Sequence, residues 1–159
     1  MYTTSHTEDL IKVFYTKLGI LKPDQLKCEI IATKLGIDIF YWDKPSQALF
    51  MEDRAWIFLN EHLTPSQMWQ DFCHELCHVL FHCGNQIYIK DSFRQYQEAK
   101  ANQFMYHACV PSFMLRELNI TDSSYKSIKT VSQLFNVDYS FASKRLAQYV
   151  SNKYYALFA

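Results

Sequence analysis

The strongest constraint on this chain is a helix-forming segment, "TPSQMWQDFCHELCHVLFHCG", which runs from Thr64 to Gly84. Thr64 suits the N-cap, Pro65 the first helical position and Gln67 the third, where its side chain completes a capping box. Gly84 is a typical C-terminal stop. Between them, apolar residues recur at the spacing of one helical face: Met68, Trp69, Phe72, Leu76, Val79 and Leu80. The segment is therefore predicted to be an amphipathic helix with one buried side.

An H-E-x-x-H motif, formed by His74, Glu75 and His78, lies inside this helix. At 100° per residue the two histidines are about 40° apart and one turn apart in height, so both imidazoles can reach one ion. Glu75 lies about 100° round the helix from His74, close enough to approach a water on that ion. Zinc hydrolysis needs nitrogen ligands, an open position for water and a carboxylate that takes the water's proton. The motif predicts a zinc hydrolase with Glu75 as general base, although the five-residue pattern alone also occurs in unrelated helices.

A third ligand is expected from the segment "QEAKANQFMYHACVP", which has helical spacing from Tyr96 to about Ala108. Glu98 lies twenty positions after His78, a separation that suits a glutamate on a following helix completing a His-His-Glu site. Asn102 falls one turn after Glu98 on the same face and could hydrogen-bond one of the ligands. Two helices would thus supply the whole site.

Two longer runs, "IFLNEHLTPSQMWQDFCHELCHVLFH" and "EAKANQFMYHACVPSFML", resemble the ImmA/IrrE family of zinc metallopeptidases. The resemblance covers residues from about 20 to 118, and the remaining helices are similar to the tail of the ImmA branch. This chain departs from the commoner family pattern at Lys100 and at "YHAC", residues 106–109, and neither departure removes a proposed ligand. The matching positions are Asn60, His74, Glu75, His78, Glu98, Ala101, Asn102, Phe104 and Pro111.

The resemblance implies a minimal gluzincin-like fold and a zinc endopeptidase that cleaves a helix-turn-helix repressor. Such an anti-repressor would release a prophage or an integrative element. It also implies a metallopeptidase domain over residues 1–118 and a C-terminal helical segment over residues 119–159, packed on the same domain.

The rest of the chain predicts a single α+β domain, because 159 residues are near the usual size of one domain. Helical patterns run from Thr7 to Leu18 and from Pro23 to Leu35, each followed by a glycine. Three short strands, expected to be antiparallel, follow in "IDIFYW", "ALFM" and "AWIFLN". Near the C-terminus, two helical patterns flank "FNVDYS" with the outline of a helix-turn-helix.

The strand "AWIFLN" is expected at the edge of the sheet, beside the metal-binding helix. An unpaired edge could bind a substrate backbone by strand addition, which makes Trp56, Phe58 and Asn60 candidate substrate-binding residues. The alternative is that the strand is only the short edge of the sheet.

Charge and composition name no partner, because 16 basic and 16 acidic side chains cancel. No apolar run approaches the roughly 20 residues that span a bilayer. The N-terminus lacks the features of an export signal, so a cytoplasmic protein without membrane contact is expected. In that compartment the five cysteines should remain thiols, most of them small buried apolar groups.

A structural metal site is an alternative for the crowded motif, because His82, Cys73, Cys77 and Cys83 surround it. Closed zinc sites usually have a second cysteine pair downstream, and this chain has none. His82 could not replace Glu98, since ligands at i, i+4 and i+8 climb about 12 Å along one helix.

A DNA- or protein-binding regulator with a non-catalytic metal site is the other alternative. It draws on the helix-turn-helix outline and on Lys126, Lys129, Lys144 and Arg145. The second helix offers few side chains for base edges and the chain is neutral overall, so direct DNA binding is not expected.

Overall fold

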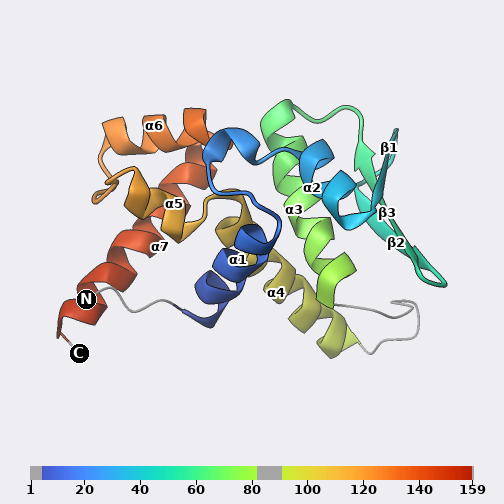
Figure 1. The fold of residues 1–159 in the computed structure, drawn as a ribbon, viewed down its shortest axis with the longest axis horizontal. Helices are drawn as coiled ribbons and strands as arrows, with labels where there is room; N and C mark the ends of the chain where they lie inside the picture. Colours follow the sequence, from blue (N-terminus) through green and yellow to red (C-terminus); the bar gives the residue numbers. More distant parts are fainter. Residues whose placement is uncertain (1–4, 82–90, 159) are drawn as a thin grey trace. The chain divides into compact units, whose positions relative to one another are not determined.

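The computed structural model describes residues 5–81 and 91–158, which fold into helices and one small sheet (Figure 1). Their contacts form two compact units, one of residues 27–105 and one that joins residues up to 26 with residues from 106 onward. The domain boundary that the family resemblance implies at residue 118 stays a prediction. The elements are α1 (His6–Lys17), η1 (Pro23–Gln25), α2 (Cys28–Leu35), β1 (Asp38–Trp42), β2 (Gln47–Met51), β3 (Arg54–Asn60), α3 (Pro65–Phe81), α4 (Asp91–Cys109), α5 (Ser112–Glu117), α6 (Tyr125–Leu134) and α7 (Tyr139–Phe158).

The sheet in residues 27–105 has the order β1-β3-β2 and is mixed. The predicted α+β class and three strands are confirmed, but the all-antiparallel arrangement was wrong, because β1 runs parallel to β3. A tight turn at Glu52 and Asp53, with φ of 57° at Glu52, makes β2 and β3 an antiparallel hairpin. Of the two hairpin strands, β3 is the one that pairs with β1.

The prediction that "AWIFLN" is an edge strand was also wrong. β3 is the central strand, paired with β1 on one side and β2 on the other. It is the longest of the three, and both Ile57 and Leu59 are fully buried, which suits a strand inside a sheet. Within the described residues, the outer strands are β1 and β2.

Helices cover one face of this sheet. α2 packs against β1, and α3 packs against β2 and β3, on the same side of the three strands (Figure 1). Because side chains alternate along a strand, Ile57 and Leu59 point to this covered face while Trp56 and Phe58 point to the other.

The start of α3 follows the predicted capping box. Gln67 N donates to Thr64 Oγ1 at 3.3 Å, and Thr64 N donates to Gln67 Oε1 at 3.1 Å. Trp69, Phe72 and Leu76 then fill the core beneath the helix. The predicted stop at Gly84 lies outside the described residues.

The other unit is entirely helical within the described residues, and it contains the predicted C-terminal helix pair. α6 and α7 are joined by a short turn in which Asn136 has φ of 50°. The Ser132 hydroxyl donates to Val137 O at 2.7 Å and closes this turn. Across the described ranges, no helix has the length and apolar character needed to cross a membrane.

A buried polar cluster lies in the core of the helical unit. Arg145 is fully buried; its Nε donates to Val110 O at 3.1 Å and its Nη2 to Ser112 Oγ at 2.7 Å. The Ser112 hydroxyl in turn donates to the Glu8 carboxylate, which lies 3.7 Å from Arg145 Nη2. Burial, followed by the positive charge of Arg145, lowers the pKa of His107 to about 4, while Glu8 acts in the opposite direction. Arg145 is therefore a core residue and is not available to DNA.

His107 should make the free energy of unfolding depend on pH. An unfolded histidine binds a proton below about pH 6.5, whereas His107 in the folded protein binds one only near pH 4. The unfolded state thus holds more protons in this window, so stability should fall as pH drops from 6.5 to 4, by at most about 3 kcal/mol.

Urea unfolding at several pH values tests this expectation in the wild type and in His107→Gln. The variant should lose less stability than the wild type between pH 6.5 and 4.5. Parallel pH profiles for the two proteins would contradict the assignment.

Candidate metal centre

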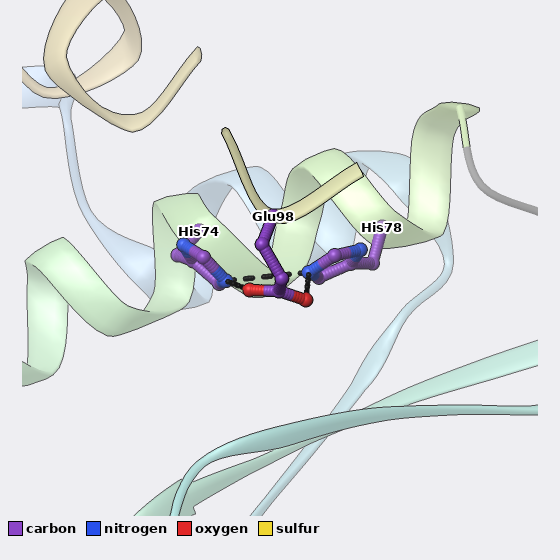
Figure 2. Close-up of side chains that lie close together, drawn as sticks. All are labelled: His74, His78 and Glu98. Atoms are coloured by element: carbon purple, nitrogen blue, oxygen red, sulfur yellow. Dashed lines mark hydrogen bonds and ion pairs between the residues drawn. The ribbon is translucent and has the colours of Figure 1, made fainter. Parts of the chain in front are cut away.

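Three of the predicted site residues converge on one point (Figure 2). His74 and His78 project from α3, one turn apart, and Glu98 reaches them from α4. Glu98 Oε2 is 3.1 Å from His74 Nε2, and Glu98 Oε1 is 3.2 Å from His78 Nε2. The two Nε2 atoms are 3.2 Å apart. All three side chains therefore offer an atom to the same position.

The hydrogen bonding of His74 tests whether this position suits a cation. His74 Nδ1 lies 3.1 Å from Asn102 Oδ1, an amide oxygen that can only accept a hydrogen bond. If the ring is neutral, its proton is on Nδ1, and the lone pair of Nε2 faces the Glu98 carboxylate. Two electron-rich atoms at 3.1 Å repel each other unless a proton or a metal ion lies between them. Two imidazole nitrogens and a carboxylate are a ligand set that zinc takes, so the residues present fit a metal ion.

The cluster is buried at one end and open at the other. The His78 side chain is 4% exposed and that of His74 18%, whereas the Glu98 side chain is 44% exposed. Protein atoms thus surround the histidines, and the solvent can reach the carboxylate side. A catalytic metal site needs such an open position, and a closed structural site does not.

Glu75 lies beside the cluster and is held by the sheet. Its Oε2 accepts a hydrogen bond of 2.8 Å from Ala48 N on β2. Burial raises the pKa of Glu75 to about 8; the Ala48 hydrogen bond opposes this shift, and the negative charges of Glu98 and Asp71 add to it. A carboxylate with raised proton affinity can take and hold a proton near neutral pH.

The sequence that contains this site matches a known protein family. Residues 32–147 match the IrrE N-terminal-like domain of the Peptidase_M78 family. The chain belongs to this metallopeptidase family. The resemblance found in the sequence is thereby confirmed.

Two relatives from Bacillus subtilis (strain 168) are similar to this M78-family chain over nearly its whole length. The phage-like element PBSX protein XkdA is 38% identical over 94% of this chain and 75% of its own. The uncharacterized protein YqaB is 36% identical over 93% of this chain and 86% of its own. One relative is thus a protein of a phage-like element.

A solved structure, a Mycobacterium tuberculosis transcriptional regulator, has the same fold over 87% of this chain, with a TM-score of 0.59. This chain spans 46% of that regulator, and the two sequences are 14% identical. The likeness therefore shows the fold of the M78-family chain and nothing about its activity.

A cleft of about 540 Å³ opens beside the metal centre of this M78-family protein. Of the three predicted substrate-binding residues, only Asn60 lines it. Trp56 and Phe58 are not among the lining residues. The lining residues are Pro45, Ser46, Asn60, Gln70, Asp71, His74, Glu75, Asn102 and Met105.

The sequence reasoning missed the main-chain partner of Glu75 and two polar residues of the cleft. Gln70 and Asp71 lie one turn before His74 and Glu75, so helical periodicity could have found both. No local signal could have found Ala48, because its contact with Glu75 depends on the order of strands in the sheet.

The cysteines on α3 do not belong to the metal cluster of this M78-family protein. Cys73 and Cys77 are buried thiols that form no disulfide, as expected from the sequence. Burial, with a smaller contribution from Glu98, raises the pKa of Cys77 to about 12, and neither thiol belongs to the cluster of His74, His78 and Glu98. His82 and Cys83, the other members of the alternative metal site, lie outside the described residues.

Proposed function

We propose that this protein is a zinc-dependent endopeptidase that cleaves a helix-turn-helix repressor and thereby releases a prophage or integrative element from repression. The observation that carries the activity is the convergence of His74, His78 and Glu98 beside a half-buried Glu75. The similarity to a phage-like element protein supports the proposed substrate. The absence of a membrane-crossing helix in the described ranges is compatible with action in the cytoplasm.

Each residue of the site has a role in this proposal. His74, His78 and Glu98 hold the zinc ion, and Asn102 keeps His74 in the tautomer that directs its Nε2 lone pair to the ion. Zinc supplies a Lewis acid that acidifies water and polarises a carbonyl. Glu75 takes the proton of the attacking water and returns it to the leaving amine. The Ala48 hydrogen bond fixes one carboxylate oxygen and leaves the other for the proton.

Strand β2 is the proposed docking edge for the substrate backbone. It is an outer strand of the sheet, and its Ala48 N–H points away from β3, toward Glu75. A peptide added to this edge in extended form would pass beside the metal ligands. The strand addition expected for β3 is therefore transferred to β2.

A direct test is incubation of the zinc-loaded protein with each helix-turn-helix repressor encoded near its gene. One repressor should be cut into two defined fragments, which mass spectrometry of the intact products would identify. Removal of zinc with a chelator should stop the cleavage, and zinc added back should restore it. If another protein is cut and none of these repressors is, the activity stands and the substrate assignment fails.

The alternative, a regulator with a non-catalytic metal site, predicts a different result. Lys126, Lys129 and Lys144 are exposed on α6 and α7, whereas Arg145 is in the core. Gel-shift binding to DNA that persists in Glu75→Gln, with no cleavage of any repressor by the wild type, would favour that alternative.

A further inference from the structure

The described residues that line the cleft lie on one side of the candidate metal centre. Gln70 and His74 lie one turn apart on α3, and so do Asp71 and Glu75, so all four share one helix face. From residue 70 to residue 75 the helix rises about 7 Å. His78 and Glu98 do not line the cleft. It therefore runs from the metal centre toward the N-terminus of α3, on the His74 side.

Asp71 gives this cleft a negative charge. Among the described residues, its lining contains no lysine or arginine, and Glu75 is its other acidic side chain. Glu75 is held by Ala48 N, and Asn102 contacts His74. Within residues 5–81 and 91–158, the Asp71 carboxylate makes no hydrogen bond or ion pair. Asp71 is thus the charged group of the cleft that can pair with a bound ligand.

Part of the wall of the cleft is apolar. Pro45 lies before β2 and Met105 on α4, and both line the same space as Asp71. Lysine and arginine combine an aliphatic stem with a cationic head. One such side chain therefore suits both the apolar lining and the Asp71 carboxylate. A volume of about 540 Å³ is ample for one long side chain.

We propose that Asp71 is a specificity-determining residue, which selects a lysine or arginine next to the scissile bond of the substrate. The stem lies against Pro45 and Met105, and the cationic head forms a charge-assisted hydrogen bond with Asp71. An acidic side chain is repelled, and a neutral one leaves Asp71 unpaired. This inference rests on the proposed peptidase function for its meaning, but the binding that it predicts can be measured without cleavage.

The binding test uses the zinc-loaded Glu75→Gln protein and four pools of eight-residue peptides that have Lys, Arg, Leu or Glu at a fixed central position. Fluorescence polarisation should show about tenfold tighter binding of the Lys and Arg pools than of the Leu pool, and weaker binding of the Glu pool. Adding Asp71→Asn should remove this preference. Adding Asp53→Asn, an exposed carboxylate outside the cleft, should leave it unchanged.

A cleavage test separates this inference from the proposed function. The wild-type protein is given a proteome digested at acidic residues, so that lysine and arginine remain inside the peptides. Enrichment of basic residues at one position beside the cut, lost in Asp71→Asn at unchanged zinc content, supports the inference. Cleavage without that enrichment, or equal binding of the four pools, overturns the role of Asp71. A binding preference without any cleavage upholds Asp71 and overturns the peptidase function.

Discussion

Glu75→Gln is expected to retain about one zinc ion per chain and to lose at least about 10³-fold in the rate of substrate cleavage. Glutamine has the size of glutamate, and its amide oxygen can still accept the hydrogen bond from Ala48 N. It cannot take a proton from water. The variant therefore removes the acid–base function and keeps the shape of the site. Metal content by mass spectrometry and single-turnover cleavage by the same preparation measure the two effects separately.

Two comparisons make this result decisive. Glu75→Ala also removes the acceptor for Ala48 N, so any additional loss of stability in that variant measures the hydrogen bond and not the chemistry. Asp53→Asn changes an exposed carboxylate in the β2–β3 turn and should cleave like the wild type. Cleavage by Glu75→Gln at the wild-type rate would rule out Glu75 as the general base. Loss of zinc from Glu75→Gln would mean that Glu75 acts through the metal centre itself.

The metal centre could be predicted from the sequence because helical geometry determines most of it. A capping box at Thr64 and Gln67 fixes where α3 begins, and the spacing of His74 and His78 then fixes which face they share. Glu98 needed one further assumption, that α4 returns to α3. The family resemblance supported this assumption, and the distances of 3.1 and 3.2 Å agree with it.

The arrangement of the sheet could not be predicted in the same way. Alternating apolar residues identify a strand, but they do not say which strand lies in the middle. The burial of Ile57 and Leu59 suits both a central strand and a half-covered edge strand. The hairpin at Glu52 and Asp53 makes β2 and β3 neighbours, and the separate parallel pairing of β1 with β3 puts β3 in the middle. The position of Trp56 and Phe58, and the contact of Ala48 with Glu75, follow from that order.

Arg145 shows a related limit of reasoning from residue type. A basic residue near a helix-turn-helix outline suggests contact with phosphate, yet Arg145 is fully buried in α7. Its charge is compensated by Glu8 and its donors by Ser112 and Val110, which lie far from it in the sequence. Only the folded chain brings these partners together, so no local pattern distinguishes Arg145 from the exposed Lys144.

Glu98→Ala is expected to weaken zinc binding far more than Asn102→Ala does. Glu98 is one of the three proposed ligand side chains, and its removal would leave two imidazoles with no negative charge to balance the ion. Asn102 only orients His74, and loss of such a partner typically costs about 10–100-fold in metal affinity. Glu98 is 44% exposed, so its truncation leaves no buried cavity, and the apo-protein should keep the far-ultraviolet circular dichroism of the wild type. Competition with a chromophoric zinc chelator measures the affinities.

Equal affinities for Glu98→Ala and the wild type would place the third ligand elsewhere. If Asn102→Ala lost more affinity than Glu98→Ala, the assignment of ligand and orienting residue would be reversed. With the expected order, cleavage should be absent in Glu98→Ala and should return in Asn102→Ala when excess zinc is added, because only the second variant retains all three ligands.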